Sequence, residues 1–485
     1  MTKAQRRLLV TAILVAIGAP QLEAQAPTSR PATTGWRVKF DGSGSSPVIA
    51  DGVLYVGSAD GAVYAVNPAT GDIKWRFQTG ERLSPATSWT QVIIAPPGST
   101  ALETAVNLGD TLRREGRRRV DMAPAVANGT VFIGSGDRSF YAIDASTGKM
   151  RWSYEAGGGM AANNNLTAPW PAAVVKNGSA YFVTDEGLHA VDTLTGKRQW
   201  VFETLQGLSA KGVGKRVPSG PVLGDGVLFL TAWPFGDPRS KPRKSFLYAV
   251  DASSGKARWV TSVDGGFVTE PVTANGFVFF AVEDSTSGPS SDSATLYAID
   301  AADGQVKWKF GAAQEFARLD LLVAGNTIYF RTDKSLSALE LESGRQLWTF
   351  SSDEISHGLR ADERHLYVVT HKTPRMMRWG RPGDTLHALD LSTGQERWSR
   401  FVGDSFDIAM ISEGVVYGGG ETLYALDAAA GKQLWSTKGL GSAHLIDGGK
   451  VFSISATSTY FGTDKVDQGY LSAIDAKTGK LARPK

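Results

Sequence analysis

A twelve-residue phrase that recurs eight times constrains the fold of this chain more than any other feature. Its first copy reads YAVNPATGDIKW at residues 64–75, and every copy ends in tryptophan. The other copies occupy 141–152, 189–200, 248–259, 297–308, 337–348, 387–398 and 424–435. Repetition at intervals of tens of residues is typical of folds built by packing copies of one supersecondary unit.

The longer unit around each phrase is predicted to be a four-stranded antiparallel meander. In the copy at 46–80, Asp51-Gly52 separates two apolar runs, which indicates a two-residue hairpin with a type I′ turn. Asn67 and Gly71 mark the turn before the fourth strand, because Asx side chains bond the downstream backbone and glycine supplies a positive φ. A single meander exposes both faces, so the copies must pack around an axis. We therefore predict an all-β chain that forms a single β-propeller.

The number of blades follows from the tryptophans, each of which supplies a large flat ring for packing against the next unit. The interval from Trp75 to Trp152 spans two units, which indicates a degenerate blade at 83–119 without its tryptophan. The last unit, 443–485, lacks a fourth strand, and TGWRVKF at 34–40 could supply it and close the ring. The sequence therefore predicts nine to ten four-stranded blades, closed by an N-terminal strand.

The repeated phrase, with its alanine, glycine and tryptophan, resembles the PQQ-like β-propeller repeat of the quinoprotein dehydrogenase type. The resemblance covers residues 36–482 and implies four-stranded blades, normally eight in that family. Members include PQQ-dependent dehydrogenases, non-catalytic propellers such as the BamB-type scaffold of outer-membrane protein assembly, and uncharacterised PQQ-binding-like repeat proteins. The resemblance therefore predicts the fold more sharply than the function.

The first 26 residues are predicted to be a cleavable signal peptide. MTKAQRR is a basic start, the apolar run after it is too short to span about 30 Å of hydrocarbon, and AQA at 24–26 fits cleavage after Ala26. Residues 27–35 are then a short linker and 36–485 the propeller domain. We expect a periplasmic or secreted protein without a transmembrane segment.

Composition limits the partners that the chain could bind. Removing the signal takes three basic residues and one acidic residue from totals of 51 and 48, so the two signs nearly balance and nothing favours nucleic acid or acidic lipid. The basic run at 113–119 is too isolated to indicate nucleic-acid binding. No cysteine is present, which excludes disulfides, thiolate metal ligands and a lipid anchor through cysteine.

The partner-binding face is predicted from loop length. In a propeller the loops between second and third strands share a face with the blade connections, and binding residues favour variable loops on a rigid scaffold. Enlarged loops are predicted at 233–245, 283–294, 371–384 and 456–469, and the connections 155–170 and 203–220 are also long. Tryptophan and arginine commonly anchor interfaces, although these side chains could equally pack on their own loops or be solvated. The predicted partner-binding residues are Trp233, Arg239, Lys241, Arg243, Lys244, Arg375, Arg378, Trp379 and Arg381.

No catalytic residue and no metal site is predicted. The six histidines show no zincin spacing, and His189 and His387 take the tyrosine position of the phrase, which indicates a structural role. The resemblance implies that a dehydrogenase of this family would hold PQQ over a central calcium with carboxylates, an amide and an arginine. Scattered carboxylates could contribute, although turn formation also explains them; they are Asp137, Asp185, Glu186, Glu270, Glu283 and Asp320.

Two principal functions are compatible with these sequence features. We expect an exported, non-catalytic scaffold that binds protein partners on the variable-loop face, BamB-like in kind and without a cofactor. The alternative is an oxidoreductase that uses PQQ and calcium to oxidise an alcohol or sugar. A carbohydrate-binding or surface-recognition propeller is a third possibility.

Overall fold

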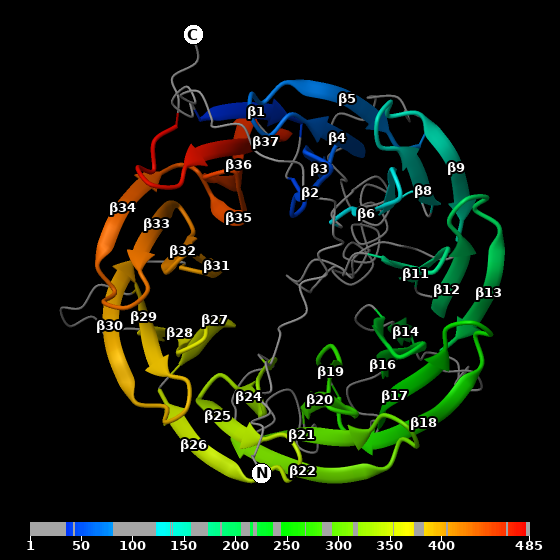
Figure 1. Ribbon diagram of the computed structural model, residues 1–485, viewed down its shortest axis with the longest axis vertical. Helices are drawn as coiled ribbons and strands as arrows, with labels where there is room; N and C mark the ends of the chain where they lie inside the picture. Colours follow the sequence, from blue (N-terminus) through cyan, green and yellow to red (C-terminus); the bar gives the residue numbers. More distant parts are fainter. Residues whose placement is uncertain are drawn as a thin grey trace, which may run out of the picture.

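Nine sheets, eight of four strands and one of five, form a ring around a common axis (Figure 1). The computed structural model describes residues 35–41, 44–80, 123–135, 137, 139–156, 173–184, 187–204, 214–216, 221–235, 244–266, 268–283, 293–313, 319–352, 354–372, 383–403, 406–461 and 464–481. In these ranges all regular elements are β-strands, and no helix is found that could cross a membrane. The predicted β-propeller is confirmed, with one blade more than the family norm. The degenerate blade predicted at 83–119 lies outside the described residues.

The blades are numbered in chain order, and each runs from the channel to the rim. Blades 1 to 3 contain β2 (Val48–Ala50), β3 (Val53–Gly57), β4 (Ala62–Val66), β5 (Ile73–Gln78); β6 (Ala125–Ala127), β7 (Thr130–Gly134), β8 (Ser139–Asp144), β9 (Met150–Glu155); and β10 (Val174–Lys176), β11 (Ser179–Val183), β12 (Gly187–Asp192), β13 (Arg198–Glu203). Blades 4 to 6 contain β15 (Val222–Gly224), β16 (Val227–Phe235), β17 (Lys244–Asp251), β18 (Ala257–Asp264); β19 (Val272–Ala274), β20 (Phe277–Glu283), β21 (Ser293–Asp300), β22 (Val306–Ala313); and β23 (Asp320–Ala324), β24 (Thr327–Arg331), β25 (Ser335–Glu340), β26 (Gln346–Ser351). Blades 7 to 9 contain β27 (Ile355–Ala361), β28 (His365–Lys372), β29 (Gly383–Asp390), β30 (Glu396–Gly403); β31 (Ile408–Ser412), β32 (Val415–Gly419), β33 (Thr422–Asp427), β34 (Gln433–Lys438); and β35 (Ser442–Asp447), β36 (Lys450–Phe461), β37 (Asp464–Asp475), β1 (Trp36–Phe40).

The hairpins between first and second strands confirm the predicted type I′ turns. Asp51 and Gly52 have φ values of 49° and 69°, the left-handed conformation that matches the twist of the flanking strands. The same pair of positive φ values recurs in five other blades: at Asn128-Gly129, Asn177-Gly178, Asp225-Gly226, Asn275-Gly276 and Glu413-Gly414. These turns and the turns between third and fourth strands lie on the same face of the ring, which we call the narrow-turn face.

The tryptophan of each blade packs against the next blade, as predicted. The Nε1–H of Trp75 donates to the carbonyl of Ala145 at 3.0 Å, and a Cβ on Gly148 would lie 2.7 Å from the indole ring. Glycine is therefore required here because the ring occupies the space of a side chain. Equivalent pairs complete the ring: Trp152–Gly196, Trp200–Gly255, Trp259–Gly304, Trp308–Gly344, Trp348–Gly394, Trp398–Gly431, Trp435–Gly479 and Trp36–Gly71.

The N-terminal strand closes the ring in the predicted manner. β1 pairs antiparallel with β37, with Trp36 opposite Ala473 and Phe40 opposite Gly469. Blade 9 is thus completed by a strand from the start of the chain, and Trp36 occupies the repeat position against Gly71 of blade 1. This exchange removes the two free ends that an open row of blades would leave.

The face opposite the type I′ turns is uneven. The middle strands of blades 4, 5, 7 and 9 extend further than the others on this face, which we call the hairpin face, and the blade connections lie there too. The expectation of an enlarged loop at 456–469 was wrong, because β36 and β37 continue as paired strands to Phe461 opposite Asp464. The run of Thr, Tyr and Phe in this segment has high β propensity, which explains the extension. The connection 203–220 likewise contains β14 (Gly214–Arg216), which pairs with the end of β16.

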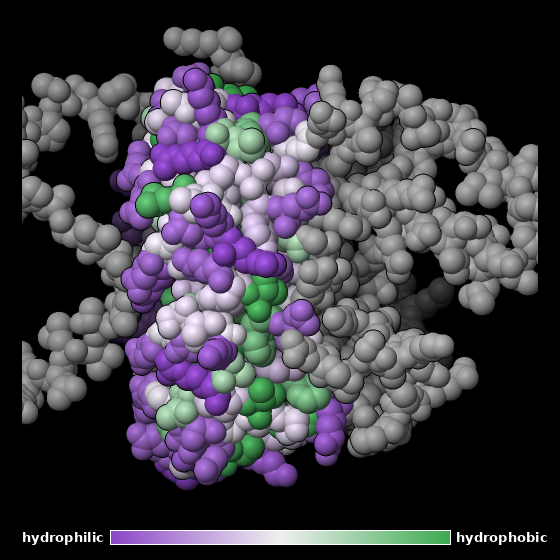
Figure 2. Space-filling view, turned by 90° about the vertical axis from the view of Figure 1, so that its right-hand side faces the viewer, coloured by the Kyte–Doolittle hydropathy of each residue, from purple (hydrophilic) through white to green (hydrophobic). Residues whose placement is uncertain are grey.

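Figure 2 shows one side of the rim, where the described surface is mainly hydrophilic with separate apolar patches. The fourth strands alternate outward polar residues with residues that pack on the next blade, as in the exposure pattern of β5. Among the described residues, the large apolar side chains that stay exposed are spread around the ring: Ile73, Met150, Leu194, Val260, Val306, Leu347, Phe401 and Leu434. Single exposed apolar residues of this kind are normal for globular surfaces.

Candidate functional site

Two of the nine predicted partner-binding residues lie in the described part of the chain. Trp233 lies within β16 rather than in a loop, and Lys244 begins β17 with an exposed side chain. These two belong to one hairpin on the hairpin face. The other predicted residues lie outside the described residues: Arg239, Lys241, Arg243, Arg375, Arg378, Trp379 and Arg381.

A buried carboxylate fixes the base of the blade 7 hairpin. Asp384 Oδ1 lies 2.7 Å from Nδ1 of His371, and Asp384 Oδ2 accepts from the backbone N–H of Phe406 at 2.6 Å. Only 2 % of the Asp384 side chain is exposed, so the carboxylate needs both partners. Phe406, fully buried, belongs to the connection into blade 8. The contacts join blades 7 and 8 next to the described ends of the hairpin, Lys372 and Gly383.

Two acidic residues occupy equivalent positions at the channel entrance on the hairpin face. Glu270 precedes β19, and Asp320 begins β23 in the next blade. Asp320 Oδ2 accepts from the backbone N–H of Leu359 at 3.0 Å and lies 4.0 Å from the buried Arg331. The Glu270 side chain is in contact with solvent, but nearby protein groups partly desolvate its carboxylate. This desolvation, and secondarily the charge of Asp320, raises the pKa of Glu270. The two acidic residues therefore differ in role, because Asp320 joins β23 to β27 of the next blade.

The described carboxylates do not fit a calcium site that could support PQQ. Calcium takes six to eight oxygen ligands, yet no three Asp, Glu or His side chains converge within the described parts of the chain. Asp137 instead forms a turn and accepts from Tyr141 Oη at 2.6 Å. Glu283 ends β20, while Asp185 and Glu186 lie outside the described residues.

His189 and His387 have the structural surroundings that the sequence predicts. His189 Nε2 lies 2.9 Å from Thr184 Oγ1, and its ring stacks on Phe182. Burial, and secondarily the charge of Arg198, lowers the pKa of His189 to about 4. His387 lies 2.9 Å from Thr370 Oγ1 and 2.6 Å from Glu396.

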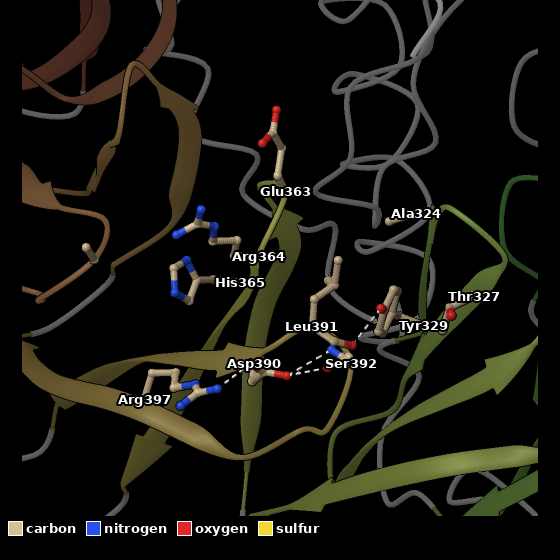
Figure 3. Close-up of a pocket in the computed structure, with 11 residues that line it drawn as sticks. Ala324, Thr327, Tyr329, Glu363, Arg364, His365, Asp390, Leu391, Ser392 and Arg397 are labelled. Carbon is tan, nitrogen blue, oxygen red and sulfur yellow. Dashed lines mark hydrogen bonds and ion pairs between the residues drawn. The ribbon is translucent and has the colours of Figure 1, made fainter. Parts of the chain in front are cut away.

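A hollow of about 700 Å³ lies on the narrow-turn face, where the sequence predicted no site (Figure 3). Turns of blades 6, 7 and 8 border it, and its polar lining includes Glu363, Arg364, His365, Asp390 and Arg397. The sequence signal was present: Glu363-Arg364 stands where most other blades have Asp-Gly or Asn-Gly. Loop length does not indicate this site, because the turn has the same number of residues as in the other blades.

Comparisons with known proteins place the chain in a family. The model described as "Outer membrane protein assembly factor BamB" matches residues 28–103, 89–232, 206–332, 281–411 and 332–483. The protein of that name from Moranella endobia (strain PCIT) is 25 % identical over 142 residues, which are 25 % of this chain and 37 % of that protein. Its counterpart from Nitrosomonas eutropha (strain DSM 101675 / C91 / Nm57) is 27 % identical over 135 residues, or 25 % and 31 % of the two chains. The match thus spans about a third of each relative's length.

Among solved structures, the quinohemoprotein alcohol dehydrogenase ADHIIG from Pseudomonas putida HK5 superposes with a TM-score of 0.53 at 16 % identity, covering 93 % of this chain and 77 % of that one. At this identity the likeness shows a shared fold and nothing of activity. The family model, by contrast, matches segment after segment around the whole ring. The chain belongs to the PQQ-like propeller family described as outer membrane protein assembly factor BamB.

Proposed function

We propose that this chain is an exported, non-catalytic scaffold that binds protein partners on its hairpin face. The observation that carries the proposal is the uneven height of the ring: blades 4, 5, 7 and 9 extend beyond their neighbours on that face alone. Membership of a family described by outer-membrane assembly supports a role among proteins of the cell envelope. Signal-peptide cleavage and a periplasmic location are part of the proposal.

The scaffold role is supported by the hydrogen bonds that fix the base of the blade 7 hairpin. The buried Asp384 ties His371 in β28 and Phe406 in the next connection to one point. The described chain on both sides of the segment that contains Arg375, Arg378, Trp379 and Arg381 is therefore held in place, and a fixed base reduces the entropy lost when a partner binds there. Arginine and tryptophan are the residue types that carry most binding energy at such interfaces.

Recovery of partners from periplasmic extract tests the proposal. Residues 373–382 are replaced by a Gly-Ser segment of equal length, which keeps His371 and Asp384 in place. The matched control changes Arg258 to Gln on the narrow-turn face. We expect the control and the unchanged protein to recover the same envelope proteins, and the hairpin variant to lose them. Equal recovery by all three proteins would overturn the assignment of this hairpin.

The same preparation separates the scaffold from the quinoprotein alternative. Purified protein is incubated with PQQ and Ca²⁺, desalted, and measured for quinone absorbance and for dye reduction with alcohols and sugars. A scaffold retains no quinone and reduces no dye. Stoichiometric retention of PQQ with alcohol-dependent dye reduction would replace the proposed function by the alternative.

A further inference from the structure

We propose that the hollow on the narrow-turn face is a second binding site, which takes an extended acidic segment of a partner protein. The inference goes beyond the hairpin-face scaffold and uses the opposite side of the ring. Its basis is a comparison among the blades themselves: within the described residues, only blade 7 has no positive φ in the turn between its first and second strands.

Blade 7 builds this two-residue turn from Glu363 and Arg364, neither of which has the positive φ found in the type I′ turns. In blade 2 the turn is Asn128-Gly129, and the Gly129 carbonyl accepts from Ala145 N–H at 3.0 Å. In blade 7 the equivalent bond runs from Leu391 N–H to the carbonyl of Arg364 at 2.8 Å. An arginine side chain thus occupies the place of a turn glycine and projects from this face.

The turn is stabilised by the carboxylate of the residue before it, Asp362. Its Oδ1 accepts from the backbone N–H groups of Arg364 and His365, both at 2.7 Å, while Oδ2 accepts from Tyr367 Oη at 2.7 Å. Oδ2 also lies 3.2 Å from Nδ1 of His365. Burial opposes ionisation, but these hydrogen bonds outweigh it and lower the pKa of Asp362. The acceptor sites of this carboxylate are therefore used within the turn.

The change leaves Arg397 with unused donors. In blade 2, Arg151 donates from one terminal nitrogen to Asp144 at 2.7 Å and from the other to Thr130 Oγ1 at 2.6 Å. The residue equivalent to Thr130 is His365, which is turned toward Asp362. Arg397 therefore donates to Asp390 alone, at 2.7 Å, among the described residues.

Arg364, His365 and Arg397 form one wall of the hollow, and along this wall hydrogen-bond donors outnumber free acceptors. The guanidinium of Arg364 makes no hydrogen bond or ion pair within the described part of the chain, and it is exposed. Asp390 is occupied by Arg397, Ser392 and Thr393, whose hydrogen bonds hold the pKa of that carboxyl well below its usual range. Figure 3 shows Arg364, His365 and Arg397 along one side and Glu363 directed away from them. The wall therefore fits a ligand that brings acceptors.

The shape of the hollow favours a peptide over a single small anion. In the view of Figure 3, His365 lies between Arg364 and Arg397, so the donors are spread along the hollow rather than gathered at one point. The volume of about 700 Å³ is that of a ligand-sized site, and small apolar groups complete it: Ala324, Leu391 and Ala429. Guanidinium groups bind carboxylates in a planar, two-bond geometry, so acidic side chains spaced along an extended segment match this wall.

Peptide binding to variants of the full chain tests the proposal. The probe is a fluorescein-labelled Gly-Glu-Ala-Glu-Leu-Glu-Gly peptide, followed by anisotropy at low salt, with its all-Gln twin as the neutral comparison. The variants are Arg364→Gln and Arg397→Gln. The matched control is Arg258→Gln, which removes an arginine at the same repeat position of blade 4. Thermal unfolding confirms that all three remain folded.

We expect the acidic peptide to bind the unchanged protein and the Arg258→Gln control alike, and to bind each blade 7 variant about fivefold or more weakly. Equal affinity for all variants, or equal binding of the Gln twin, would overturn the proposal. Displacement of the peptide by equimolar inorganic phosphate would also overturn it, because the site would then hold a small anion. The purified protein suffices, so the result is independent of the hairpin-face partner.

Discussion

Lys450 of the last blade donates through Nζ to the carbonyl of Ala69 in the first blade, at 2.6 Å. It also donates to the carbonyl of Pro68 at 3.1 Å, which the indole of Trp36 shares. Only 6 % of Lys450 is exposed, and burial lowers its pKa. The equivalent position in the other blades holds no second lysine. The seam where the ring closes is thus joined by strand exchange, tryptophan packing and a buried cation.

Replacing Lys450 by Met should weaken this seam. The change removes two charge-assisted hydrogen bonds and leaves the carbonyl of Ala69 without its partner, for a loss of about 1–2 kcal/mol in the free energy of unfolding. Chemical denaturation measures the loss, with the exposed Lys438→Met as control. A stability equal to that of the control would show that the lysine contributes nothing to closure.

A methyl group at Gly431 should test the packing of tryptophan on glycine. A Cβ there would lie 2.5 Å from the ring of Trp398, whereas a Cβ on Gly414 would meet nothing within 4 Å. Both glycines have positive φ, at 65° and 73°, so backbone strain is similar. Gly431→Ala should therefore cost about 1–3 kcal/mol more than Gly414→Ala. Equal losses in denaturant titrations would mean that the ring moves aside freely.

Replacing Glu413 by a residue that tolerates a positive φ should increase the stability of the fold. It adopts a φ of 48° at a position where the other type I′ turns use Asp or Asn. Asparagine tolerates the left-handed region better than glutamate, so Glu413→Asn should raise the unfolding free energy by about 0.5–1 kcal/mol. The melting temperature is the readout, and Glu421→Asn supplies the control for charge removal. No gain over that control would contradict the strain argument.

His189 should make the fold less stable as the pH falls. Its folded pKa of about 4 lies below the value of about 6.5 expected in the unfolded chain. Between these values the unfolded state binds the proton and the folded state does not, so stability decreases as the pH drops through that window. His189→Tyr, which restores the repeat residue, should flatten the dependence relative to the unchanged protein. Equal slopes of unfolding free energy from pH 7 to pH 4.5 would exclude this role.

The repeat was sufficient to predict what each blade builds locally. Asp51-Gly52 dictates a type I′ turn through backbone sterics, and the spacing of Trp75 fixes its contact with the next blade. The matching motif at Trp36 was enough to predict strand exchange. These features depend on a few neighbouring residues, which is why the sequence reveals them.

Features that depend on contacts between blades were harder to predict. Lys450 reaches a carbonyl more than three hundred residues away in the chain, and nothing near it in the sequence indicates that partner. Asp384 likewise meets Phe406 only because two blades are adjacent. The segment 456–469 was read as a loop because its polar residues conceal the pairing of β36 with β37. The hollow beside Arg364 forms only where three blades meet.

Site-specific photocrosslinking tests most directly whether the hairpin face carries the function. A photoreactive residue replaces Lys244, exposed on the blade 4 hairpin, or Lys256, exposed on a narrow turn of the same blade. In living cells the account predicts discrete adducts to envelope proteins from position 244, lost when residues 373–382 are replaced by Gly-Ser. Adducts of the same kind and yield from both positions, or none from position 244, would contradict a scaffold that works through its extended hairpins.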